Sequence, residues 1–246
     1  MKPIDAAQQF IEKYFPNCDC ALLAGSVVRN EVTSTSDLDI VVFDDYVQSS
    51  YRESFIEFGW PIEVFVNNFI SYQRFFKSDY ERARPSLAKM ISEGIVLKNH
   101  DFIKKIKREA NDLLKNGPKR WSNKTIMMKR YMITDLLYDF IGSSQREVEI
   151  VIASHLLESI SEFVLRTNRK WVGTSKWLVR TLEDYDKELA HHFFISFDEF
   201  FKTENKQHII QLVDMVLEPF GGRLFAGFNV GKDELLNNNS KEIEGE

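Results

Sequence analysis

The sequence predicts an α+β fold, in which a small mixed β-sheet domain is followed by an all-α helical bundle. Two observations favour this class. The first 67 residues contain short apolar runs rich in β-branched residues, which are typical of buried strands. Beyond residue 67, apolar residues recur mainly at helical spacing. We expect the sheet to be packed by helices on one side.

The expected elements follow from these patterns. A helix over 4–15 ends at Pro16-Asn17, and strands follow at 20–25, 38–43 and 62–66. Further helices are expected at 68–80, 85–93, 101–115, 123–141, 146–168, 175–194 and 205–218. Since Gly117-Pro118 breaks a helix, we expect one domain over 1–117 and a helical domain over 118–231. The tail over 232–246 is rich in Asn and Glu and is expected to be disordered.

The composition is that of an ordinary globular protein and argues against some classes of partner. The 246 residues are 43% hydrophobic and 28% charged, with a formal net charge of −5. A protein that holds duplex nucleic acid normally shows a basic face, so no duplex partner is expected. Two cysteines, Cys18 and Cys20, are expected to be reduced thiols. No apolar run is long enough for a membrane span, so we expect a cytoplasmic protein without a membrane partner.

One stretch carries recognisable chemistry. The first predicted strand ends at Gly25-Ser26, and ten residues later Asp37-Leu38-Asp39 begins the second. Asp37 and Asp39 are two residues apart and therefore project from one face of the strand. Such carboxylates repel each other unless a cation lies between them, and their hard oxygen atoms suit Mg²⁺. Glu63 on the next strand offers a third carboxylate if that strand pairs beside them.

The residues around this motif suit a phosphorylated ligand. Gly25 lets the backbone approach a phosphate, and Ser26 adds a hydroxyl and an amide donor at an expected helix start over 27–30. Arg29 and Arg84 are further candidates to neutralise phosphates.

This arrangement resembles the signature of the DNA polymerase β-like nucleotidyltransferase superfamily, and the run over 82–99 resembles kanamycin nucleotidyltransferase-like proteins. The resemblance implies a catalytic domain over 1–117 and a substrate or dimerisation domain over 118–231. It implies that Gly25 and Ser26 hold the triphosphate and that Asp37 and Asp39 bind Mg²⁺. Glu63 takes the third acidic position, where Asp is commoner, so it either binds metal or acts as the base.

The resemblance also implies a reaction. A nucleoside monophosphate, AMP from ATP or from another triphosphate, passes to a hydroxyl group of a small molecule such as an aminoglycoside-like antibiotic, and pyrophosphate leaves. A homodimer is compatible with it. The base is Glu63 or a carboxylate of the helical domain, for which Asp135, Glu158 and Glu162 are candidates, although a solvated helix face is their commoner role.

Other functions stay open at this point. The chain could be a nucleotidyltransferase-type antitoxin, a protein- or RNA-modifying adenylyltransferase, or a non-catalytic nucleotide-binding module. An RNase site in the helical half would need a shorter Arg-to-His spacing than the sequence offers. Trp171 and Trp177 can stack on a ring, but packing is their commoner role. The histidines His155, His191 and His192 lack metal-ligand partners at helical spacing.

Overall fold

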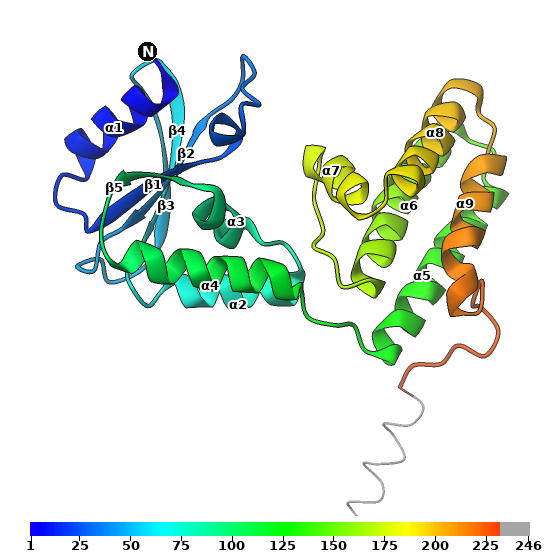
Figure 1. The fold of residues 1–246 in the computed structure, drawn as a ribbon. Helices are drawn as coiled ribbons and strands as arrows, with labels where there is room; N and C mark the ends of the chain where they lie inside the picture. Colours follow the sequence, from blue (N-terminus) through cyan, green and yellow to red (C-terminus); the bar gives the residue numbers. More distant parts are fainter. Residues whose placement is uncertain (232–246) are drawn as a thin grey trace, which may run out of the picture. The chain divides into compact units, whose positions relative to one another are not determined.

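The computed structural model describes residues 1–231, and the chain divides into two compact units, Met1–Lys119 and Arg120–Glu246. The first contains a five-stranded mixed sheet with four α-helices (Figure 1), and the second contains helices and no strand within its described residues. The predicted α+β class is therefore confirmed. The predicted disordered tail over 232–246 lies outside the described residues.

The sheet has the strand order β3-β4-β2-β1-β5. Its strands are β1 (Cys20–Ala24), β2 (Leu38–Phe43), β3 (Tyr51–Glu57), β4 (Trp60–Asn67) and β5 (Ile95–Lys98). Only the central β2–β4 pair is parallel, and the other pairs are antiparallel. The first residues of β2 and β4 therefore lie at the same end of the sheet, which is the arrangement on which the candidate site depends.

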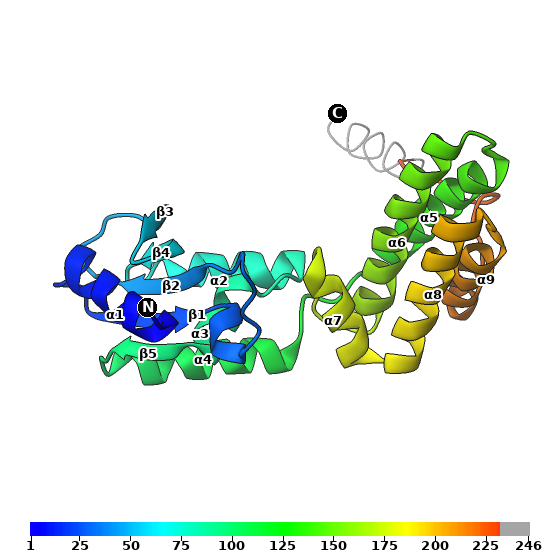
Figure 2. The same cartoon turned by 90° about the horizontal axis from the view of Figure 1, so that it is seen from above.

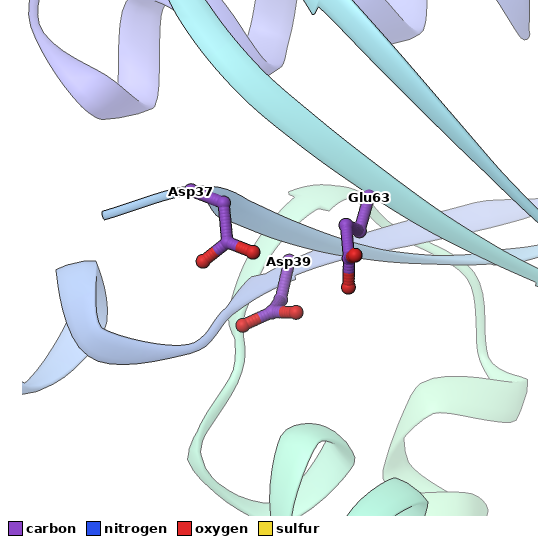
Figure 3. Close-up of side chains that lie close together, drawn as sticks. All are labelled: Asp37, Asp39 and Glu63. Carbon is purple, nitrogen blue, oxygen red and sulfur yellow. The ribbon is translucent and has the colours of Figure 1, made fainter. Parts of the chain in front are cut away.

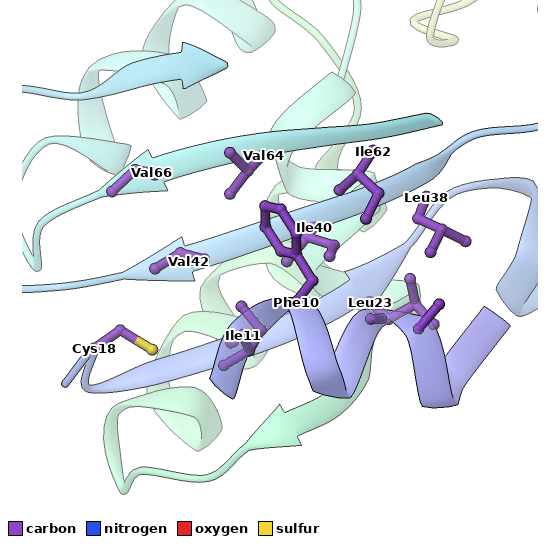
Figure 4. Close-up of a cluster of buried hydrophobic side chains, with 13 residues drawn as sticks. Phe10, Ile11, Cys18, Leu23, Leu38, Ile40, Val42, Ile62, Val64 and Val66 are labelled. Atoms are coloured by element: carbon purple, nitrogen blue, oxygen red, sulfur yellow. The ribbon is translucent and has the colours of Figure 1, made fainter. Parts of the chain in front are cut away.

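Both faces of the sheet are covered, so the expectation of helices on one side only is wrong. Helix α1 (Pro3–Tyr14) packs on one face, through a cluster that includes Phe10, Ile40 and Val64 (Figures 2 and 4). Helices α2 (Tyr72–Arg82), α3 (Ser86–Glu93) and α4 (Phe102–Asn116) cover the other face around Val41 and Phe43. Because both faces are buried, β1 and most of β2 are continuous apolar runs.

Two strands were not predicted from the sequence. Strand β3 is joined to β4 by a two-residue turn in which Phe58 and Gly59 both have positive φ, at 54° and 81°. Both positive angles are those of a type I′ hairpin turn. Strand β3 is largely exposed at the edge of the sheet, so its residues lack the strict alternation of a half-buried strand. Strand β5 has only four residues.

Two predicted helices differ from the structure by more than two residues at one end. Helix α2 begins at Tyr72 rather than 68, because the Asn68 side chain accepts hydrogen bonds from the N–H groups of Ile70 and Ser71. The helix predicted over 175–194 is two helices, α7 (Lys176–Tyr185) and α8 (Lys187–Thr203). Asp186 divides them, since its extended backbone ends α7 and its side chain caps α8.

The second unit also contains α5 (Asn123–Gly142), α6 (Arg146–Thr167), α9 (Gln207–Leu217) and the 3₁₀ turn η2 (Glu218–Phe220). Helix α5 packs against α6 and α9, and α8 packs against α7 and α9. Phe140 and Phe200 meet edge to face in the core, with ring centroids 5.0 Å apart. Over residues 1–231, no helix combines the length and the apolar character needed to cross a membrane.

Candidate metal centre

Three carboxylates meet on one face of the sheet (Figure 3). Asp37 directly precedes β2, Asp39 is the second residue of β2, and Glu63 lies beside Asp39 on the parallel strand β4. One oxygen from each side chain lies within 4.8 Å of the others. Three hard oxygen ligands so close together can hold a divalent cation such as Mg²⁺. We refer to these three residues as the acidic cluster.

The period of a β-strand explains why these side chains converge. Leu38 and Ile40 belong to the core beneath α1, as do Ile62 and Val64. Side chains alternate along a strand, so the acids between these residues point to the opposite face. The parallel register sets Asp39 against Glu63 without an offset. Burial of the neighbouring apolar residues therefore fixes the direction of the acids.

Gly25 lies against the Asp39 carboxylate. Strand β1 ends at Ala24, which pairs with Asp39, and Gly25 follows with φ of 82° and ψ of −160°. A Cβ atom at position 25 would overlap Oδ2 of Asp39. Only glycine adopts this backbone conformation without strain, and only glycine leaves room for the carboxylate.

Ser26 opens a 3₁₀ turn, η1 (Ser26–Arg29), where a helix start was expected over 27–30. Its hydroxyl donates a hydrogen bond to Oγ of Ser36 at 3.2 Å. Ser36 in turn accepts one from the N–H of Thr33 at 2.9 Å. These bonds join the start of the turn to the residue before Asp37, so the loop between β1 and β2 is held at both ends.

The electrostatics of the cluster favour a bound cation. Burial, together with the negative charges of Asp37 and Glu63, raises the pKa of Asp39 to about 6. Arg29 and Arg52 lower the pKa of Asp39, but they offset only part of this effect. A divalent cation would relieve both the desolvation and the repulsion. The donor set, its spacing and its excess negative charge all fit Mg²⁺.

The two arginines predicted to bind phosphate have different surroundings. Arg29 forms ion pairs with Glu31 at 3.0 Å and with Glu93 at 2.8 Å, and its charge reaches Asp39. Arg84 is exposed in the turn between α2 and α3, and it is not among the charges that act on Asp39. The structure therefore brings Arg29, but not Arg84, into the electrostatic surroundings of the acidic cluster.

Arg52 was missed by the sequence reasoning. It lies on β3, and its guanidinium forms an ion pair with Oε1 of Glu63. Because β3 was not predicted, nothing in the sequence brought Arg52 near Glu63. The two-residue turn at Phe58-Gly59 is the one signal that could have revealed this hairpin.

The helical unit supplies no second metal centre within residues 1–231, where the acidic cluster is the only group of its kind. Asp135 and Glu158 are exposed, whereas Glu162 pairs with Lys129 at 2.6 Å. Arg180 lies over the ring of Trp177, and Trp171 is half-buried. His155, His191 and His192 are exposed.

Comparison with known proteins shows distant structural similarity only. No family model matches the sequence. No curated protein compared with it matches either. Among solved structures, the chain is similar to a nucleotidyltransferase-like protein from Exiguobacterium sibiricum 255-15. The TM-score is 0.42 and the identity 11%, over 88% of this chain and 73% of that one. A similarity this distant establishes neither a family nor an activity.

Proposed function

We propose that this chain is a Mg²⁺-dependent nucleotidyltransferase that transfers a nucleoside monophosphate, AMP from ATP, to a hydroxyl group of a small-molecule acceptor. The observation that carries this proposal is the acidic cluster. Asp39 and Glu63 are in register on parallel strands, Asp37 precedes them, and Gly25-Ser26 lies at the end of the adjoining strand β1. This combination suits a metal–triphosphate ligand better than it suits a purely structural role.

The transfer itself makes few chemical demands on the protein. The acceptor oxygen forms a bond to the α-phosphorus, the bond from that phosphorus to the bridging oxygen breaks, and pyrophosphate leaves with the electron pair. The acceptor proton passes to a base. When bound, Mg²⁺ supplies charge neutralisation for the attacking and departing oxygens. The remaining contribution of the protein is positioning and electrostatic stabilisation.

The residues of the first unit have distinct parts in this proposal. Asp37 and Asp39 hold the cation, and Glu63 completes the ligand set or takes the acceptor proton. Gly25 presents backbone to the triphosphate with no side chain in the way, and the Ser26 hydroxyl donates to a phosphate oxygen in place of Ser36. Arg29 contributes positive charge while its pairs with Glu31 and Glu93 hold it in place.

The helical unit is proposed to bind the acceptor and, by analogy with kanamycin nucleotidyltransferase-like proteins, to support a homodimer. Asp135 and Glu158 are alternative bases with exposed carboxylates. Glu162 would first have to leave Lys129, with which it pairs at 2.6 Å.

The proposal is tested with ATP labelled on its α-phosphate. The protein is incubated with this ATP, Mg²⁺ and, separately, aminoglycosides, other hydroxylated metabolites, protein and RNA. Label should move to one acceptor class with release of one pyrophosphate per transfer, and Asp37→Asn or Asp39→Asn should abolish it. The proposal fails if no acceptor takes the label, or if Asp39→Asn transfers at the wild-type rate. A protein that binds nucleotide without transfer would be a binding module.

A further inference from the structure

Arg52 is placed beside the acidic cluster by the β3–β4 hairpin. Ser54 pairs with Glu63 and Arg52 pairs with Phe65 in the antiparallel register. Directly opposed residues share a face of the sheet, so Arg52 lies on the same face as Glu63. Its guanidinium forms an ion pair with the Glu63 carboxylate, and its central carbon lies 5.1 Å from the centroid of the Phe65 ring.

The charge of Arg52 reaches the whole acidic cluster. Its hydrogen bond to Glu63 raises the pKa of Arg52 most, and the charges of Glu63, Asp39 and Asp37 raise it further. Arg29 is the other cation that acts on Asp39, but it is held in ion pairs by Glu31 and Glu93. Arg52 therefore supplies a positive charge directly to Glu63.

We propose that Arg52 is an exchangeable counter-charge: it pairs with Glu63 in the metal-free protein and pairs with a nucleotide phosphate once Mg²⁺ and nucleotide are bound. This inference rests on the proposed function, because it takes the acidic cluster as the metal centre of a nucleotide site. It gives Arg52 two opposite effects. Arg52 competes with the free metal ion for Glu63, and it supports the metal–nucleotide complex.

The exposure of the pair makes the exchange feasible. The side chain of Arg52 is 57% exposed and that of Glu63 is 25% exposed. An ion pair so open to water is weak and easily broken, whereas a divalent cation between three carboxylates is held by several charges at once. Phe65 gives the guanidinium a second contact, which persists when Glu63 is released. A planar guanidinium on such a support can pair with phosphate oxygens through two parallel hydrogen bonds.

The test compares Arg52→Gln with the wild-type protein in two titrations. The first uses Mn²⁺ alone, followed by electron paramagnetic resonance, as a probe of the metal centre. Removing a positive charge beside the cluster should tighten Mn²⁺ binding roughly fivefold. The second uses a non-hydrolysable ATP analogue at saturating Mg²⁺. Loss of the phosphate contact should weaken analogue binding about tenfold.

Controls separate this inference from nonspecific effects of charge. Arg74→Gln removes an exposed arginine from α2 and should change neither titration. Phe65→Leu keeps Arg52 but removes its aromatic support, so it should weaken analogue binding while leaving Mn²⁺ binding within about twofold of wild type. Thermal melts establish that each variant is folded.

The outcomes of these titrations test the Arg52 exchange separately from the metal centre. Tighter Mn²⁺ binding with weaker analogue binding supports the proposal. If Arg52→Gln leaves Mn²⁺ affinity unchanged or lowers it, or if analogue affinity does not fall, the exchange is overturned while the metal centre stands. If wild-type protein binds Mn²⁺ no better than Asp39→Asn does, the metal centre and the exchange are overturned together.

Discussion

Gly25 and Asp39 form a single packing unit, because the carboxylate of Asp39 occupies the space that a side chain at position 25 would need. Ala24, the residue before Gly25, pairs with Asp39 across β1 and β2. The glycine thus has a structural role in the candidate site besides any contact with a phosphate. It sets the direction of a carboxylate that belongs to the acidic cluster.

Gly25→Ala should therefore impair both stability and metal binding. The strained backbone alone should cost about 1–3 kcal/mol of unfolding free energy, measured by urea denaturation. Displacement of the Asp39 carboxylate should also weaken Mn²⁺ binding on the order of tenfold. Gly59→Ala is the matched control, since Gly59 has nearly the same φ, 81°, but open space at its Cβ position. It should cost stability and leave Mn²⁺ binding intact. Wild-type Mn²⁺ affinity in Gly25→Ala would contradict the packing argument.

The raised pKa of Asp39 predicts how stability depends on pH without metal. Its pKa is about 6 in the folded protein, against 3.8 for an unperturbed carboxyl. Between these values the folded state binds more protons than the unfolded state, so the unfolding free energy falls as pH rises. The ionised carboxylate then costs up to about 3 kcal/mol above pH 6, and nothing below about pH 4.

Asp39→Asn should consequently be more stable than wild type above about pH 6 in a chelating buffer. The difference should shrink as pH falls and disappear near pH 4. Urea denaturation at a series of pH values measures it, with exposed Asp112→Asn on α4 as the control that should show no such profile. A variant that is less stable than wild type at neutral pH would show that the Asp39 charge is stabilised by its surroundings.

Glu63→Gln should weaken metal binding while leaving the stability of the protein nearly unchanged. The Arg52–Glu63 ion pair is open to water, so its loss should change the unfolding free energy by less than about 1 kcal/mol. Loss of one of three ligand charges should nevertheless weaken Mn²⁺ binding on the order of tenfold. Glu53→Gln on the same hairpin is the control, because Glu53 pairs with Val64 and so lies on the other face. Equal Mn²⁺ affinity in Glu63→Gln and wild type would remove Glu63 from the metal centre.

Asp79 is predicted to be a structural acid rather than a functional one. Its side chain is only 1% exposed, and it accepts hydrogen bonds from the Leu87 N–H at 3.0 Å and from Arg82 at 2.6 Å. Asp79→Ala leaves the Leu87 donor without its partner and should cost about 2–3 kcal/mol. Arg82→Ala should cost less, because that side chain is half-exposed. If Asp79→Ala and Arg82→Ala unfold at the same urea concentration, the hydrogen bond from Leu87 to Asp79 does not stabilise the α2–α3 turn.

The convergence of Asp37 and Asp39 was predictable for two reasons. Side chains alternate along a strand, and the flanking apolar residues had to face the core. Asp37 and Asp39 had to share a face once Leu38 and Ile40 were buried. Glu63 joined them only through the parallel pairing of β2 with β4, a long-range relationship that local pattern suggests but does not fix.

The elements missed by the sequence analysis were missed for separate physical reasons. Strand β3 lies at a sheet edge, where exposure on both faces removes the apolar signal that identifies a strand. Arg52 was missed for the same reason, because it lies on β3. The division between α7 and α8 was hidden because apolar spacing continues across Asp186, whose capping side chain decides the break. Arg84 was predicted to neutralise phosphate from a helix start, and that role stays a prediction.

The most direct test of the central claim is the binding of a non-hydrolysable ATP analogue, measured by calorimetry with and without Mg²⁺. The account predicts binding to wild type that requires Mg²⁺, and its loss in Asp39→Asn although that variant is folded. Three carboxylate oxygens leave part of the Mg²⁺ octahedron to be filled by triphosphate oxygens, so metal and triphosphate should bind together. Equal binding without Mg²⁺, or equal binding to Asp39→Asn, would contradict the assignment of the acidic cluster as a metal–nucleotide centre.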